Sequence, residues 1–243
     1  EISNKGNGIF LEKRATPSNN ATPISDVSVR AEDDLAGAGL GVIYKSVASI
    51  SDLPLTCTNN FKTKVRGDAE ISADDYYVIF ETATGSEWSE GSWVETVGFN
   101  VTQRLLASSM PHQLINTGPN EFTLQEINYA DRTVGDEDSN KMPSFVGSKI
   151  DGMFLYKNRL GFISGDSVSL SESGEFFNFF RTTVTTLLDS DRIDVSVSSR
   201  KITNLKAGIG FQENLILFSD NSQFVLKGGD NLTPKTVSIT PVT

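Results

Sequence analysis

Short runs in which apolar and polar residues alternate recur along most of this chain, and they predict strands rather than helices. Residues 61–66 alternate in this way, and residues 76–82 combine aromatic and β-branched side chains. Such side chains fit the pleated, half-buried face of a sheet. Residues 93–97 follow a Gly- and Ser-containing loop and are the expected partner of the 76–82 strand. The pattern therefore predicts a mainly β protein.

Two segments in the second half share one pattern and predict a repeated unit. Residues 156–164 and 211–219 each run from an aromatic residue through three polar residues and a short apolar run to a serine. A small polar turn and a second strand-like run follow each serine, and Gly, Asn and Asp suit such tight turns because they tolerate positive φ. Ser164 and Ser219 lie 55 residues apart, close to the period of a kelch-like propeller blade. We expect one blade of a β-propeller-like domain and the start of another.

Other apolar runs predict the remaining elements of the second half. Residues 175–180 hold four Phe in five positions, which indicates a helical turn that fills the core between sheets, or alternatively a binding patch. The Thr-rich residues 182–188 are typical of a strand but fit a short helix as well. The expected strands are 122–124, 153–156, 160–163, 193–196, 202–207, 214–219, 222–227 and 236–240.

Changes in composition predict three parts of the chain. Residues 1–46 are rich in Asn, Ser, Thr, Pro and Gly, which indicates a loop-rich N-terminal segment. Residues 47–138 form a β-sandwich-like or mixed β domain, and residues 139–243 form the start of the β-propeller-like domain. The boundary falls in the acidic, Gly- and Ser-containing stretch 131–140. Because the chain begins without Met and ends in a strand-like run, we expect it to be part of a longer protein.

The negative charge is placed unevenly along the chain. The formal net charge is −10; residues 1–142 hold 11 Lys and Arg against 21 Asp and Glu, whereas residues 143–243 hold 10 against 10. A protein that reads nucleic acid needs a basic footprint, and none is visible here. A solvated, soluble surface accounts for the excess of carboxylates. No apolar run reaches the length of a membrane-spanning helix.

Few residues in the chain are suited to catalysis or to metal binding. His112 is the one histidine and has no Gly-x-Ser-x-Gly motif beside it, so a Ser-His-Asp triad is not indicated. Cys57 is the one cysteine, so the chain cannot form an internal disulfide. One histidine and one cysteine are too few for a His/Cys metal site. Residues 131–138 and 189–194 hold carboxylates that suit either a cation or the capping of turns. We predict no catalytic, cofactor-binding or metal-binding residue.

A group of short segments, taken in order and spacing, resembles the tail tubular protein B family, the tail nozzle proteins of short-tailed phages. The similarity is strongest over residues 143–243 and fainter over 47–112. Arg192 stands where the family has a proline in the Asp-Ser-Asp-x-Ile-Asp run. The matching segments are 51–54, 75–78, 93–96, 143–147, 157–162, 170–171, 177–180, 185–191, 193–195 and 224–226.

This resemblance implies a structural, non-enzymatic component of the virion tail. Such a protein forms a ring, expected to be a hexamer, below the tail adaptor ring protein and in contact with the tail fibres. DNA is retained in the ring and then ejected through it without sequence-specific binding, and an acidic lumen would let this polyanion slide. The alternatives are a tail-associated polysaccharide hydrolase with two facing carboxylates, or a carbohydrate-binding module that stacks sugars on Trp88 and Trp93.

Overall fold

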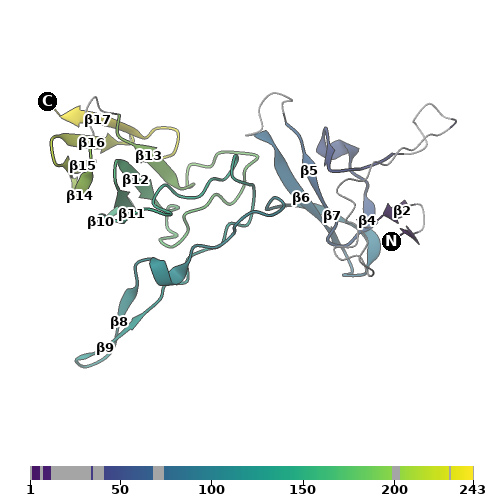
Figure 1. Ribbon diagram of the computed structural model, residues 1–243, viewed down its shortest axis with the longest axis horizontal. Coiled ribbons are helices and arrows are strands. Elements are labelled where there is room, and N and C mark those ends of the chain that lie inside the picture. The colour runs from purple at the N-terminus through teal and green to yellow at the C-terminus, as the bar shows by residue number, and fades with distance from the viewer. Residues whose placement is uncertain are drawn as a thin grey trace, which may run out of the picture. The chain divides into compact units, whose positions relative to one another are not determined.

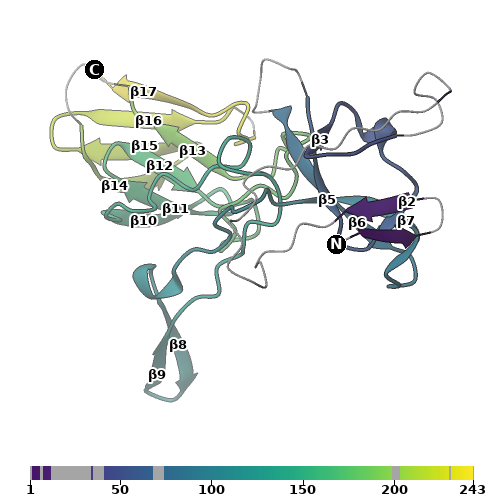
Figure 2. The same cartoon turned by 45° about the vertical axis from the view of Figure 1, so that its right-hand side comes forward.

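In the computed structural model the regular secondary structure of the described residues is almost entirely β-strand (Figures 1 and 2). It describes residues 2–5, 8–11, 34, 41–67, 74–198, 203–229 and 231–242. The chain divides into two compact units, Glu1–Thr96 and Val97–Thr243. This division does not test whether residues 47–138 and 139–243 fold independently, so the boundaries expected from the sequence stay predictions. Of the loop-rich segment expected at residues 1–46, residues 1, 6–7, 12–33 and 35–40 lie outside the described residues.

The first unit contains a five-stranded sheet in the order β3-β5-β6-β7-β4. β3 runs parallel to β5, and the other pairs are antiparallel. The partnership predicted for residues 76–82 and 93–97 is confirmed, because β6 pairs with β7, although β7 begins earlier, at Trp88. The elements of this unit are β1 (Ile2–Lys5), β2 (Gly8–Leu11), β3 (Ser46–Val47), η1 (Ile50–Asp52), β4 (Thr56–Thr58), β5 (Lys62–Val65), β6 (Tyr76–Thr82) and β7 (Trp88–Thr96).

Trp93 belongs to the core of the first unit rather than to an open sugar platform. Its ring packs edge-on against Phe80, with centroids 5.0 Å apart, and it contacts the buried cluster that includes Val65 and Val78. Its indole N–H donates to the carbonyl oxygen of Pro54 at 2.9 Å. The indole nitrogen therefore has a partner within the unit, as a partly buried Trp requires.

The second unit contains two four-stranded antiparallel sheets, each with its strands in chain order. The predicted hairpin of residues 153–156 and 160–163 is confirmed as β10 and β11. Both strand-turn-strand repeats are confirmed as well, as β11-β12 in one sheet and β15-β16 in the other. The first sheet comprises β10 (Gly152–Tyr156), β11 (Arg159–Ser164), β12 (Ser167–Leu170) and β13 (Ile193–Ser196). The second comprises β14 (Leu205–Phe211), β15 (Asn214–Ser219), β16 (Gln223–Lys227) and β17 (Ser238–Val242).

These two sheets share one hydrophobic core. Ile163 and Leu170 from the first sheet lie in one buried cluster with Leu217 and Phe224 from the second. The sheets lie side by side in both views (Figures 1 and 2). A second cluster covers the other face of the first sheet, where Phe162 stacks on Phe179 with ring centroids 5.0 Å apart. The two central strands, β11 and β12, are thus buried on both faces, whereas Met153 and Leu155 of the edge strand β10 are exposed.

A separate β-hairpin extends away from the sheets of the second unit. It consists of β8 (Gln113–Gly118) and β9 (Glu121–Gln125), and the short helix η3 (Ala107–Ser109) precedes it. In both views the hairpin extends beyond the rest of its unit (Figures 1 and 2). The sequence predicts the strand at 122–124 but not its partner, because Gln113–Gly118 holds only two large apolar residues.

Two sequence predictions about the second unit are wrong in their secondary structure. Residues 175–180 form turns and not a helical turn, since Asn178 donates its side-chain amide to Glu172 and fixes an irregular loop. Phe179 and Phe180 are buried as expected, whereas Phe176 and Phe177 are more than a third exposed. Residues 182–188 form bends and neither a strand nor a helix. Two of the expected strands begin later, at Leu205 and Ser238.

Candidate functional site

A buried arginine organises the loops between the strands of the second unit. Lys157 and Asn158 turn the chain with positive φ values of 45° and 58°, and this turn places Arg159 at the start of β11 with 1% of its surface exposed. Its guanidinium donates to five main-chain carbonyl oxygens, those of Ser171, Asp189, Ser190, Asp191 and Leu232. Burial lowers the pKa of Arg159, while the charges of Glu172 and Asp191 oppose that shift. Arg159 therefore joins segments up to 73 residues apart.

A second buried arginine, Arg132, holds the loop that precedes the first sheet. Its guanidinium donates to the carbonyl oxygens of Thr102 and Asn140 and to the carboxylate of Glu137, at 2.6, 3.0 and 2.7 Å. It also lies over the ring of Phe180, 5.5 Å from the centroid. The stretch 131–140 is therefore an ordered loop, in which the carboxylate of Asp136 accepts from the main-chain N–H groups of residues 138 and 139.

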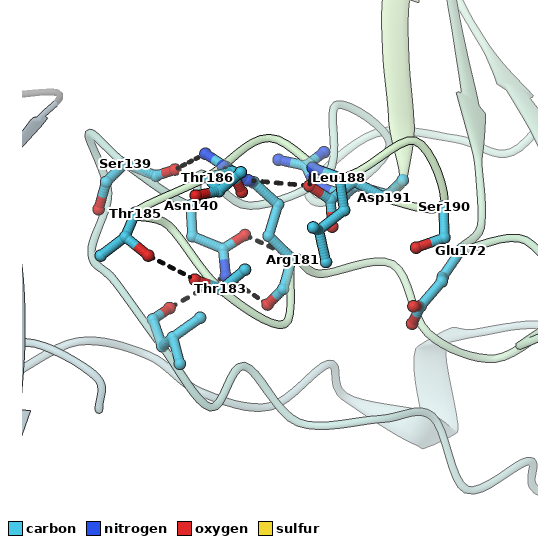
Figure 3. A network of polar contacts seen from close by, with 12 residues as sticks. Ser139, Asn140, Glu172, Arg181, Thr183, Thr185, Thr186, Leu188, Ser190 and Asp191 are labelled. Atoms are coloured by element: carbon cyan, nitrogen blue, oxygen red, sulfur yellow. Dashed lines mark hydrogen bonds and ion pairs between the residues drawn. The ribbon is translucent and has the colours of Figure 1, made fainter. Parts of the chain in front are cut away.

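Asn140 connects this loop to the segment that follows the buried phenylalanines (Figure 3). Its side-chain amide donates to the carbonyl oxygens of Val134 and Arg181, and its side-chain oxygen accepts from the main-chain N–H of Arg181 at 3.1 Å. Arg181 in turn donates to the carbonyl oxygens of Ser139 and Thr186. This reciprocal pairing replaces regular secondary structure with a network of specific polar contacts.

The acidic run 189–194 stabilises turns and loops, as one of its two interpretations predicted. The buried carboxylate of Asp191 accepts from the main-chain N–H of Leu188 at 2.8 Å and lies 3.4 Å from Nε of Arg181. The carboxylate of Asp194 accepts from the main chain and the hydroxyl of Ser144 and pairs with Arg192. Within the described residues, no group of three His, Cys, Asp or Glu side chains is arranged to hold a metal ion.

The histidine and the cysteine of this chain belong to different units, His112 to the second and Cys57 to the first. His112 is exposed, and its Nδ1 lies 2.9 Å from the carbonyl oxygen of Met110. Cys57 is buried in the first unit, and burial raises the pKa of its thiol. A buried thiol with a raised pKa is a weak nucleophile. Trp88, the other candidate for sugar stacking, lies half-buried in β7.

The pockets of the second unit are small and polar. One of about 370 Å³ has Lys157, Arg159, Asp189 and Thr233 among its lining residues, and another of about 300 Å³ is lined by serines, Lys149 and two aspartates. Arg159 already donates to five carbonyl oxygens, which leaves it little capacity for a ligand. In the smaller pocket the Ser167 hydroxyl donates to the carboxylate of Asp166 at 3.0 Å, and neither pocket is lined by a histidine.

Exposed apolar side chains gather instead on surfaces suited to protein contacts. The face of the second sheet that points away from the shared core exposes Ile209, Phe211 and Phe218. The β8-β9 hairpin exposes Leu114, Phe122 and Leu124. Apolar groups of this size at the surface mark interaction sites. The functional features of this chain are therefore a rigid loop network and apolar surfaces.

Comparisons with known proteins agree with a structural role. The sequence model of the bacteriophage nozzle protein family matches residues 13–243. The chain belongs to this family. It is also similar to "Tail tubular protein gp12" of Escherichia phage T7, with 36% identity over 212 residues that make up 87% of this chain. The matched region is 26% of the length of that relative.

Membership of the nozzle protein family makes this chain a structural component of a phage tail and part of the virion. The resemblance inferred from the short segments is thereby confirmed. Among the described residues, no helix has both the length and the apolar character needed to cross a membrane. The loop network was missed by the sequence analysis, because Arg is usually exposed and nothing in the pattern marks Arg132 or Arg159 as buried.

Proposed function

We propose that this chain is part of a subunit of the tail nozzle, a ring around the tail axis through which the phage DNA is retained and then ejected. The observation that carries the proposal is the family match over residues 13–243, together with the similarity to the T7 tail tubular protein. A tube is built from repeated copies, and copies that meet through two different surfaces form a ring when the rotation between neighbours closes on itself. We propose six copies, which contact the tail adaptor ring protein and the tail fibres.

The distribution of charge supports a passive DNA conduit. Residues 1–142 carry ten more carboxylates than Lys and Arg, and the remainder of the chain is neutral. Each Lys or Arg that contacts a phosphate adds a salt-dependent gain in affinity for DNA. A wall without such contacts does not hold a moving duplex, so we propose that the acidic part of the chain faces the channel.

The arrangement of the two sheets supports a propeller-like domain. Both have four antiparallel strands in chain order, and they share one buried core that contains Leu217, Phe224 and Ile163. The outer face of the second sheet, with Ile209 and Phe211, is as apolar as a face that a further sheet would cover. We propose that these sheets are two successive blades and that residues 139–243 are the start of the propeller-like domain.

No observation on the described residues favours the polysaccharide hydrolase or the carbohydrate-binding module. Trp93 packs on Phe80, and the two aspartates that line the smaller pocket are already engaged, Asp151 with Lys149 and Asp166 with Ser167. We propose that the protein acts mechanically and not as an enzyme. A subunit with this role needs rigid elements, which the carbonyl contacts of Arg159 supply.

Mass photometry of the full-length purified protein, followed by negative-stain microscopy, tests the proposed ring. We expect particles of six subunit masses with a hole along the axis. A stable monomer at micromolar concentration, even with the purified tail adaptor protein present, contradicts the proposal. Release of reducing ends from host capsule polysaccharide would support the hydrolase instead.

A further inference from the structure

The β8-β9 hairpin has an apolar face that nothing in the described part of the chain covers. Leu114 pairs with Leu124 across the two strands, and Phe122 lies two residues before Leu124. Side chains two residues apart on a strand point to the same side, so these three residues share one face. Their exposed fractions are 65%, 60% and 68% for Leu114, Phe122 and Leu124. The opposite face carries Ile115 and Thr123.

The base of this hairpin, in contrast, is fixed firmly in the core. Met110, before β8, and Ile127 and Tyr129, after β9, are buried in the same cluster as Phe162 and Phe179. The hydroxyl of Tyr129 donates to the carbonyl oxygen of Pro111 at 3.0 Å and joins the two ends of the hairpin. The hairpin is therefore held in a set direction, although a two-stranded hairpin alone in water is marginally stable.

The chemistry of the hairpin suits a protein partner and excludes nucleic acid. Residues 105–131 contain Glu121, Glu126 and Asp131 and no Lys or Arg. This acidic segment repels phosphates. Burial of its apolar face against another apolar surface is favourable, because it removes that face from water. A partner needs an apolar surface with positive charges at its rim. Residues 143–243 carry ten Lys and Arg against ten Asp and Glu, and the side chains of Lys149, Lys206 and Lys235, each paired with an aspartate, are at least half exposed.

We propose that the β8-β9 hairpin of one copy docks, through Leu114, Phe122 and Leu124, on residues 143–243 of the next copy. This inference rests on the proposed ring, since only a repeated assembly supplies that second copy beside every hairpin. The acidic residues 1–142 of a neighbour repel the hairpin, and this favours the charge-balanced part as the receiving surface. The three side chains expose roughly a few hundred Å² of apolar surface, a substantial part of the ~800 Å² that each partner buries in a standard interface.

Photo-crosslinking in the full-length protein tests this contact. Phe122 is replaced by p-benzoylphenylalanine, and equal amounts of ¹⁴N- and ¹⁵N-labelled protein are assembled together and irradiated. We expect mixed-isotope peptide pairs that join position 122 to residues 143–243 of another copy. Replacement of Thr123, on the opposite face, is the matched control and is expected to give at least fivefold less of this product. Pairs that form within one copy only, or that join other regions, overturn the inference.

A variant with Leu114→Ser, Phe122→Ser and Leu124→Ser separates this inference from the proposed ring. We expect wild-type rings in mass photometry and at least tenfold fewer rings for the variant, with the melting curve of the dissociated subunit unchanged. If the wild type and the variant form rings equally well, the hairpin contact is wrong and the ring stands. If the wild type forms no ring, the proposed function itself fails.

Discussion

Arg159 donates a hydrogen bond to the main-chain carbonyl oxygen of Asp191 at 2.7 Å, and not to the side-chain carboxylate of that residue. The carboxylate of Asp191 is used elsewhere, on the main-chain N–H of Leu188 and beside Arg181. Asp191 thus connects two arginines through different groups. The loops between the strands of the second unit are held by such contacts, and these loops are where we expect substitutions to have their largest effects.

Replacement of Arg159 by Lys is expected to destabilise the second unit by about 3 kcal/mol, because an ammonium cannot reach five separated carbonyl oxygens and leaves buried acceptors unpaired. Urea denaturation followed by circular dichroism measures this, since both tryptophans lie in the first unit and do not report on the second. The matched control is Arg104→Lys, since Arg104 has an exposed side chain paired with Asp131, and we expect a change within about 0.5 kcal/mol. Equal effects at the two positions would contradict the role of Arg159.

Asn140→Asp is expected to destabilise the protein by about 2 kcal/mol at neutral pH. The substitution removes the amide that donates to Val134 and Arg181 and places a carboxylate against their carbonyl oxygens. Lowering the pH protonates the new carboxyl, so part of the loss should be recovered. The exposed Asn128→Asp is the control, and we expect it to leave the denaturation midpoint almost unchanged. No recovery at acidic pH would count against this explanation.

Gly161 is required because Phe154 packs directly across it. The two residues face each other in the β10-β11 pair, and a Cβ at Gly161 would collide with the Phe154 ring. Gly161→Ala is therefore expected to lower the free energy of unfolding by about 1–3 kcal/mol, measured by thermal or chemical denaturation. Gly210→Ala on β14 is the matched control, since its Cβ would meet Tyr156 at an ordinary 3.4 Å. If Gly161→Ala destabilises a Phe154→Leu variant less than it destabilises the wild type, the collision with the Phe154 ring is the cause.

Tyr129 gives the protein an alkaline pH dependence. Burial raises the pKa of its phenol to about 12, above the ordinary value of 10. In the unfolded chain the phenol loses its proton near pH 10, whereas in the folded protein it keeps it, so stability falls as the pH rises from about 10 to 12. At pH 8 the Tyr129→Phe variant is expected to unfold with a free energy about 1 kcal/mol lower than the wild type, because it lacks the hydrogen bond to Pro111. Above pH 10 its free energy of unfolding is expected to fall less steeply with pH. Parallel curves for the two proteins would contradict this assignment.

The strands with a strong local signal were predicted from the sequence, and the contacts between distant segments were not. Tyr76–Thr82 is a strand with the predicted bounds because its aromatic and β-branched residues favour that conformation on their own. Residues 175–180 were predicted as a helical turn that fills the core. They form an irregular loop, in which Asn178 donates to Glu172, the carbonyl oxygen of Phe177 accepts from Ala130, and Phe179 stacks on Phe162. One of the carbonyl oxygens that accept from Arg159 belongs to Leu232, 73 residues away. Every residue has a main-chain carbonyl, so the sequence does not show which ones Arg159 will contact.

The sequence also did not predict which apolar residues of the strands are exposed at the surface. Local pattern predicts that Phe122 and Leu124 lie on a strand, and only the structure shows that their side chains are exposed. Phe162 also lies on a predicted strand, in β11, and it is fully buried. Burial depends on which segments pack against a strand, and for β9 that partner is absent from the described part of the chain.

Electron cryomicroscopy of the full-length purified protein is the measurement that tests the central claim most directly. The account predicts a closed ring of six subunits, with a channel wide enough for duplex DNA and the acidic residues of 1–142 along its wall. Particles without an axial channel, or rings in which residues 1–142 lie on the outer surface, would contradict the account.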